Sequence, residues 1–276
     1  MNANIFREYD IRGRVPDELD EETVHRLGLA FGTYYQDRGV TRVSLGRDCR
    51  LSSPELSEAL QYGMRETGLH VLNVGMVPTP LLYFSLFHHE PSGGVQITGS
   101  HNPPDYNGLK ICIGKATIYG EEIQKIREIA EAGRFTKGRG RYQETDVVTP
   151  YLEHLQKNIR PGGVDRKVVI DAGNGVAGLV APEVYERMGI EVEALFCEPD
   201  GRFPNHHPDP TIPENLKDLI TRLSESSAHL GIAFDGDGDR IGVVDHEGQI
   251  IWGDQLMIIF SRDLLKGHPG PRLWGR

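Results

Sequence analysis

The sequence predicts an α/β protein of two similar α/β/α layered domains, each built on a mixed, largely parallel sheet. Short runs of β-branched and apolar residues alternate with segments of helical spacing along almost the whole chain. Prolines stand at or near the first turn of several helical segments, as the start of a helix allows. The length of 276 residues is enough for two domains of ordinary size. Alternation of this kind is typical of α/β layers.

The first half of the chain supplies one set of such elements. Strands are expected at residues 42–45, 69–74 and 94–98, where apolar residues run without helical periodicity. Helices are expected at 54–66 and 80–89, which carry helical spacing and an early proline. We expect these strands and helices to alternate as they do around a parallel sheet.

The second half repeats the pattern. A glycine-rich, basic stretch at residues 133–140 has no periodicity and indicates a turn or linker. A helix is expected from about residue 150, and the domain boundary near residue 147. The later elements are strands at 167–170, 191–196, 230–234 and 241–244, and helices at 176–188 and ending at 226. The predicted division is 1–147, 148–250 and a last piece, 251–276.

The last piece departs from this order. Residues 253–266 predict an amphipathic helix, and residues 268–276 have no pattern. We expect this helix to open a third domain of which the rest is missing. An apolar helix face left in water would favour self-association or a protease-sensitive end. That face is formed by Leu256, Ile259, Phe260 and Leu264.

Composition and charge argue against several classes of function. The net charge of −10 argues against general nucleic-acid binding, which needs a basic face. No apolar run approaches the roughly 20 residues that span a bilayer, so no membrane role is expected. The N-terminus lacks the order of a signal peptide, and three scattered cysteines predict no disulfide framework. A cytoplasmic protein is the expectation.

An acidic loop follows the expected strand at 230–234. Asp235, Asp237 and Asp239 alternate with glycines, so their side chains point to a common side and repel one another unless a cation neutralises them. Mg²⁺ prefers such oxygen ligands and leaves coordination positions for phosphate. An EF-hand does not fit, because Arg240 and His246 occupy the positions of its glycine and glutamate. The alternative is a solvated acidic turn.

A second polar loop, Thr98-Gly-Ser-His-Asn-Pro103, follows the expected strand at 94–98. Ser100 is a candidate nucleophile or phosphorylated residue, and an ordinary turn hydroxyl is the alternative. The Gly-x-Ser-x-Gly elbow of α/β hydrolases does not fit, because Thr98 and Asn102 occupy its glycine positions. A phosphoserine would add negative charge that an Asp-bound cation neutralises. His101 is either a phosphate-contacting or positioning group, or a structural histidine.

A glycine pattern at residues 173–178 matches Gly-x-Gly-x-x-Gly between an expected strand and helix. Glu191 or Glu193 lies near the acidic position of a dinucleotide-binding motif. A tight turn between strand and helix needs the same glycines for the same backbone reasons. A nucleotide-dependent oxidoreductase is therefore an alternative function that rests on this motif alone.

Four stretches in order resemble the α-D-phosphohexomutase family, in particular its bacterial phosphomannomutase/phosphoglucomutase branch. The acidic and serine loops are the most specific of them. The stretches are residues 5–13, 98–110, 171–175 and 235–240. The resemblance implies interconversion of hexose 1-phosphate and hexose 6-phosphate, with mannose and glucose as the leading sugars.

The resemblance also implies a set of roles. Ser100 would carry the phosphate, and a hexose 1,6-bisphosphate would be the intermediate and the activator. The phosphoserine and the three aspartates of the acidic loop, Asp235, Asp237 and Asp239, would hold Mg²⁺. Tyr9, Arg12, Lys110 and Arg240 would face the phosphosugar. Arg12 and His101 would assist the transfer, with Lys110 as acid and base; we expect nearby cations to lower the Lys110 pKa.

The resemblance implies two further domains with sugar- and phosphate-recognition loops that this sequence does not contain. We therefore expect the chain to be truncated and its mutase turnover to be impaired. A truncated fragment that binds metal or phosphate without catalysis is the alternative outside enzymes.

Overall fold

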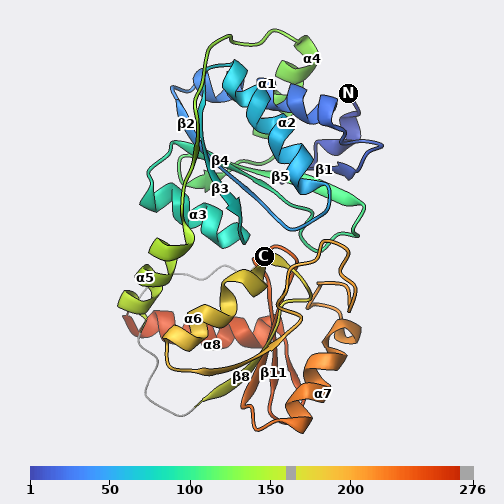
Figure 1. The fold of residues 1–276 in the computed structure, drawn as a ribbon, viewed down its shortest axis with the longest axis vertical. Coiled ribbons are helices and arrows are strands. Elements are labelled where there is room, and N and C mark those ends of the chain that lie inside the picture. The colour runs from blue at the N-terminus through green and yellow to red at the C-terminus, as the bar shows by residue number, and fades with distance from the viewer. Residues whose placement is uncertain (160–165, 268–276) are drawn as a thin grey trace.

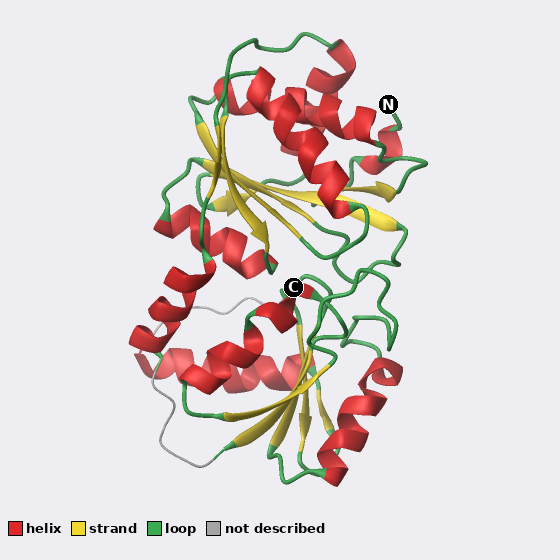
Figure 2. Cartoon of the chain, in the orientation of Figure 1, coloured by secondary structure: helices red, strands yellow, loops and turns green. Residues whose placement is uncertain are grey.

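The chain forms two α/β/α bodies, one above the other in Figure 1. The structure is a computed structural model that describes residues 1–159 and 166–267. Each body has one sheet with helices on both of its faces, which confirms the predicted fold class (Figure 2). The expectation of a patternless end at 268–276 lies outside the described residues.

The sheet of the first domain is mixed, in the order β1-β5-β4-β2-β3-β7, and β6 also pairs with β5. Strand β2 is parallel to both β4 and β3, and β3 is parallel to β7. Strand β5 is antiparallel to β4, β1 and β6. The loops that follow β2, β3 and β4 therefore leave the sheet at one edge. The strands are β1 (Ile11–Arg14), β2 (Arg42–Arg47), β3 (His70–Met76), β4 (Gly93–Ile97), β5 (Tyr106–Ile113), β6 (Ala116–Thr117) and β7 (Tyr142–Glu144).

Helices α1 (Glu21–Gln36), α2 (Ser53–Glu66) and α4 (Glu121–Ala132) cover one face of this sheet, and α3 (Thr79–His88) covers the other (Figure 1). A short 3₁₀ helix, η1 (Ala3–Ile5), precedes β1. Helix α1 begins where the Asp20 carboxylate accepts a hydrogen bond from the Thr23 amide. The core between these helices and the sheet is apolar and closed to solvent; it includes Leu27, Phe31, Leu45, Leu60 and Val95.

Helices α1 and α2 touch through glycines. A Cβ added to Gly28 would stand 2.4 Å from the carbonyl oxygen of Leu60, and one added to Gly63 would stand 2.2 Å from that of His25. Both neighbours are backbone atoms, so a side chain at either position would force the helices apart.

We predict that Gly28→Ala lowers the free energy of unfolding by about 1–3 kcal/mol, the usual cost of overpacking a core. Urea denaturation would measure it. The matched control is Gly253→Ala, because nothing lies within 4 Å of a Cβ at Gly253; its effect should stay within about 0.5 kcal/mol or favour folding. Equal stability of Gly28→Ala and the parent chain would contradict the close contact of the two helices.

The sheet of the second domain has the order β12-β11-β10-β8-β9. Strand β8 is parallel to β10 and β9, and β11 is antiparallel to β10 and β12. Helix α7 covers one face, with α6 and α8 on the other (Figure 1). The elements are α5 (Val148–Asn158), β8 (Lys167–Asp171), η2 (Val176–Leu179), α6 (Ala181–Arg187), β9 (Glu191–Leu195), η3 (Pro213–Leu216), α7 (Lys217–Glu225), β10 (Leu230–Phe234), β11 (Ile241–Asp245), β12 (Ile250–Ile251) and α8 (Gly253–Gly267).

The helix expected at 176–188 is divided in the structure. A 3₁₀ turn, η2, ends at Leu179, and α6 starts afresh at Ala181. Pro182 lies in the first turn of α6, where its missing N–H costs no hydrogen bond. One continuous helix would have placed this proline in its interior, so the prediction of a single helix was wrong.

An apolar cluster holds the two domains together. It joins Leu81 of α3, Leu152 of α5 and Val180 just before α6, and each of these side chains is at most 3% exposed. Because α5 packs on both α3 and α6, the cluster fixes the loops of one domain against those of the other.

The C-terminal helix α8 is largely in water. Ile259, Phe260 and Leu264 are about half exposed, as expected, but Leu256 is 7% exposed and contradicts the expectation for that residue. Self-association through this face stays a prediction. None of the helices in the described residues, α8 included, has both the length and the apolar composition needed to cross a membrane.

Candidate active site

Two loops from different domains meet at one point. The serine loop follows β4, and the acidic loop joins β10 to β11. The hydroxyl of Ser100 donates a 2.7 Å hydrogen bond to Oδ2 of Asp235, 135 positions away in the sequence. Ser100 is 2% exposed and Asp235 is fully buried. The fold therefore brings together the two motifs that sequence reasoning singled out.

Ser100 has a strained backbone. Its φ is +50°, a left-handed conformation that costs an L-residue about 1–2 kcal/mol. Gly236 of the acidic loop lies directly behind it, and a Cβ there would stand 2.5 Å from the carbonyl oxygen of Ser100. Strain of this kind persists only where the surroundings fix it, and it is concentrated at functional sites.

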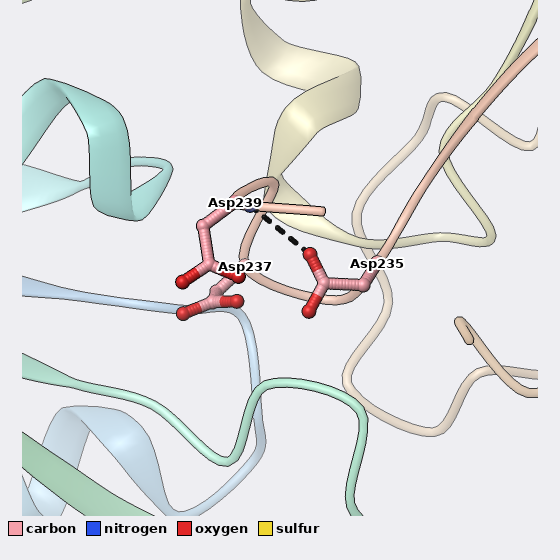
Figure 3. Close-up of side chains that lie close together, drawn as sticks. All are labelled: Asp235, Asp237 and Asp239. Atoms are coloured by element: carbon pink, nitrogen blue, oxygen red, sulfur yellow. Dashed lines mark hydrogen bonds between the residues drawn. The ribbon is translucent and has the colours of Figure 1, made fainter. Parts of the chain in front are cut away.

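The three carboxylates of the acidic loop converge (Figure 3). One oxygen from each of Asp235, Asp237 and Asp239 lies within 4.8 Å of the others. Oδ1 of Asp235 accepts hydrogen bonds of 3.0 Å from the amides of Asp239 and Arg240. Asp235 and Asp237 are 0% exposed, so a solvated acidic turn does not describe them. The flanking elements are strands, in agreement with the rejection of an EF-hand.

The electrostatics of this cluster favour a cation. Burial and the charges of Asp237 and Asp239 raise the pKa of Asp235 to about 8. Oδ1 of Asp237 is buried and has no hydrogen-bond partner among the described residues. Hard carboxylate oxygens at this spacing match the ligand preference of Mg²⁺. The residues present therefore fit the expected metal.

Two side chains of the first domain contact Asp237. Thr79, at the start of α3, donates through Oγ1 to Asp237 Oδ2 at 2.5 Å. Lys110 Nζ donates to Oδ2 of Asp237 and of Asp239 at 2.6 and 2.5 Å. We expected nearby cations to lower the Lys110 pKa, and this was wrong. Burial does lower it, but the charges of the two aspartates outweigh burial and raise the pKa of Lys110.

A cavity of about 480 Å³ opens above Ser100. Tyr9, Arg12, Lys110 and Arg240, the residues expected to face substrate, all line it. Nε of Arg12 is buried without a partner among the described residues, although Nη2 donates to Asp10. A concave space with converging cations is suited to a phosphorylated ligand. The roles of these four residues stay predictions.

Sequence reasoning missed other residues that line this cavity. Arg7 and Asp10 lie within the stretch at 5–13, so that motif could have indicated them. Tyr83 comes from α3, and Tyr119 follows β6 and lies 6.5 Å from Tyr9 between ring centroids. No motif marks these two tyrosines, and only the fold places them here.

His101 lies beside the serine, with Nδ1 3.2 Å from Ser100 Oγ. Burial and the charge of Arg240 lower the pKa of His101, so the neutral ring is favoured. Its carbonyl oxygen contacts the ring of His207 in the second domain. His207 lies in the segment between β9 and η3, so the contact shows that this segment touches the serine loop.

The glycine motif at 173–178 is explained by packing. A Cβ at Gly175 would stand 2.8 Å from the carbonyl oxygen of Gly236, and one at Gly178 would stand 2.0 Å from that of Cys197. Gly175 lets the turn pass against the acidic loop, and Gly178 lets it pass against the backbone of Cys197. The motif therefore needs no dinucleotide to account for it.

A histidine next to this turn gives the fold a pH dependence. His206 Nε2 lies 3.0 Å from the buried carboxylate of Asp171, with Asp218 as a second nearby charge. Burial lowers the pKa of His206, but the hydrogen bond and charge of Asp171 outweigh it and raise the pKa. Because the pKa of His206 is higher in the folded state, protonation of this histidine stabilises the fold. The stabilisation is complete below about pH 6.5, the ordinary pKa of histidine, and is lost as the pH rises through the folded-state pKa.

We predict that His206→Gln destabilises the protein more at about pH 6 than at about pH 9, because only the lower pH retains the protonated histidine. Urea denaturation at both pH values would measure this difference. His246→Gln is the matched control, since His246 is exposed and should show the same small effect at both. An equal loss at both pH values for His206→Gln would contradict the charged pair.

The fold and the site together define a class of protein, the phosphoglucomutases and phosphomannomutases. Residues 3–137 match the family described as "Phosphoglucomutase/phosphomannomutase, alpha/beta/alpha domain I", and residues 149–248 match its domain II. The chain belongs to this family.

The names of individual relatives support this family assignment. The chain is 48% identical over 270 residues to "Phosphomannomutase/phosphoglucomutase" of Pseudomonas aeruginosa, covering 98% of this chain and 58% of the relative. It is 46% identical to "Phosphoglucomutase" of Neisseria meningitidis, covering 98% of this chain and 59% of the relative. A crystal structure of a phosphoglucomutase/phosphomannomutase family protein from Burkholderia thailandensis superimposes with a TM-score of 0.94 at 44% identity, over 98% of this chain and 60% of that one. The chain thus spans about 58–60% of the length of these relatives.

Proposed function

We propose that this chain carries out the phosphoryl-transfer chemistry of a phosphohexomutase acting on glucose or mannose phosphates. The observation that carries the proposal is the 2.7 Å contact of Ser100 Oγ with Asp235, where the two domains meet. The names of the relatives support the reaction class and the two sugars.

The proposed cycle uses Ser100 as a phosphate carrier. Phosphoserine passes its phosphoryl group to the free hydroxyl of a hexose phosphate; the bond from phosphorus to Oγ breaks, the bond to the sugar oxygen forms, and the hydroxyl proton ends on Oγ. The resulting hexose 1,6-bisphosphate reorients in the cavity, so that its other phosphoryl group faces Ser100. Its other phosphoryl group then returns to Ser100 by the reverse exchange. Positioning and charge stabilisation provide most of the catalysis in such transfers.

Magnesium is part of the proposal. Asp235, Asp237, Asp239 and the phosphate on Ser100 would hold the ion. When bound, Mg²⁺ neutralises charge on the transferring phosphoryl group. The chain's own part is to gather three carboxylates, of which Asp235 and Asp237 are buried, and the Oδ1 atom of Asp237, which has no hydrogen-bond partner among the described residues, supports this role.

The cavity supplies the substrate contacts in this proposal. Arg12 and Arg240 would pair with phosphate oxygens, and Tyr9 would lie against the sugar. Lys110 would give a proton from its ammonium group to the leaving oxygen and take one back from the reacting hydroxyl, because the ammonium group lines the cavity beside the acidic loop. His101 would contact the phosphate on Ser100. A cytoplasmic location completes the proposal, supported by three free cysteines.

The test is conversion of glucose 1-phosphate to glucose 6-phosphate, followed by ³¹P NMR with Mg²⁺ and catalytic glucose 1,6-bisphosphate. We expect slow conversion that EDTA abolishes. Uptake of phosphate on Ser100 without any conversion would favour the alternative of a non-catalytic phosphate-binding chain. Neither uptake nor conversion would contradict the proposed function.

A further inference from the structure

Arg50 is a fully buried arginine whose guanidinium group is satisfied completely. It lies in the loop between β2 and α2 and is 0% exposed. A guanidinium group has five N–H donors, and a buried one destabilises the fold unless they are paired. Nε donates to Oδ2 of Asp48 at 3.2 Å. The remaining partners are main-chain oxygens: those of Ser100, Asn102 and Pro103 in the serine loop, and that of Tyr106 at the start of β5.

These contacts fix the peptide groups on both sides of Ser100. Arg50 Nη2 donates to the carbonyl oxygen of Ser100 at 2.8 Å. On the other side, the amide of Ser100 donates to Oγ1 of Thr98, also at 2.8 Å. With both groups held, the serine keeps its φ of +50° and its hydroxyl points at Asp235.

Asp48 ties the same loop to the end of β2. Its carboxylate accepts from the amide of Gly99 at 3.0 Å and from the hydroxyl of Ser53 at the start of α2. Arg50 packs so tightly that a Cβ on Gly99 would stand 2.3 Å from its Cζ. The residue before the serine must therefore be glycine for Arg50 to fit.

The second domain covers this arrangement. The ring of Phe203 lies 5.3 Å from Arg50 Cζ, and a Cβ on Gly201 would stand 2.4 Å from the carbonyl oxygen of Cys49. The cavity above Ser100 does not include Arg50 among its lining residues. Arg50 thus acts on the serine from behind, without access to a ligand in that cavity.

We propose that Arg50 and Thr98 are positioning residues for phosphate transfer at Ser100. They hold the serine in its left-handed conformation by fixing the carbonyl and the amide of that one residue. This inference rests on the proposed function, because it assigns the two residues to the transfer that Ser100 would perform.

The experiment compares Arg50→Lys, Thr98→Val and Thr98→Ser with the parent chain. Lysine keeps the charge but cannot reach four carbonyls, valine keeps the shape of threonine without its acceptor, and serine keeps the acceptor. Arg127→Lys on the exposed face of α4 is the matched control for the arginine change. Two quantities are measured: the rate of phosphate uptake per folded molecule from glucose 1,6-bisphosphate with Mg²⁺, and amide hydrogen exchange of residues 99–106.

We expect Arg50→Lys to slow uptake by about 100-fold, the effect of misplacing a reacting group by about 1 Å. Thr98→Val should slow uptake by about tenfold, whereas Thr98→Ser and Arg127→Lys should match the parent. Amide exchange at 99–106 should rise in Arg50→Lys and Thr98→Val alone. If Arg50→Lys does not fold, the valine and serine pair at Thr98 decides the question.

The outcomes separate this inference from the proposed function. Parental uptake rates and unchanged exchange at 99–106 in both variants would overturn the positioning role alone. A loss of thermal stability with an unchanged uptake rate per folded molecule would also overturn it, because a structural role predicts that result. A parent chain that takes up no phosphate would overturn the proposed function and this inference with it.

Discussion

Ser100→Ala is expected to abolish phosphate uptake from glucose 1,6-bisphosphate, a loss of about 10⁴-fold or more. The change removes the oxygen that would form the bond to phosphorus. Alanine is held at the same φ by the same backbone contacts, so the variant should fold like the parent. Intact-mass spectrometry after incubation with the bisphosphate and Mg²⁺ measures the effect.

The control for this substitution is Ser92→Ala, since Ser92 is exposed and precedes β4, at the opposite end of that strand from Ser100. It should take up phosphate at the parental rate. A Ser100→Ala chain that still gains a phosphoryl group would show that another residue carries it, and the assignment of Ser100 would be wrong.

Asp237→Asn should weaken Mg²⁺ binding by at least about 100-fold. Removing a residue that only hydrogen-bonds a metal ligand already costs about 10- to 100-fold in metal affinity, and Asp237 would itself be a ligand. Phosphate uptake should slow by orders of magnitude with it. The carboxylate also accepts from Thr79 and Lys110, so the amide would disturb the contact between the domains as well.

Calorimetry with Mg²⁺ measures the affinity directly and does not depend on turnover. Asp17→Asn is the matched control, because Asp17 is exposed and belongs to neither loop. Equal affinity for Mg²⁺ in Asp237→Asn and the parent would rule out the role given to the acidic loop.

Local signals in the sequence were sufficient for the two loops and for the strands that precede them, but they did not indicate α1, β5 or α4. The strand at 230–234, the acidic loop and the strand from 241 are where the pattern places them. The meeting of Ser100 with Asp235 follows from loops that leave two sheets at facing edges, and the family resemblance supported it. Pro182 shows what apolar spacing cannot predict. The spacing continues as one helix through residues 176–188, but a new helix begins at Ala181, with this proline in its first turn.

Features that depend on packing between distant segments could not be predicted. Arg50 has an ordinary place in a loop, and only the fold shows that its donors meet the carbonyls of the serine loop. The pKa of Lys110 depends on which charges stand nearest, and those are the aspartates of the other domain. Leu256 is covered although its neighbours on α8 are exposed. Each case is decided by tertiary contacts that no short motif records.

The most direct test of the central claim is the mass of the parent chain after incubation with glucose 1,6-bisphosphate and Mg²⁺, followed by digestion to locate the phosphate. We predict a gain of one phosphoryl group, on Ser100, that phosphatase removes and that EDTA prevents. An unchanged mass, or a phosphoryl group on any other residue, would contradict the account.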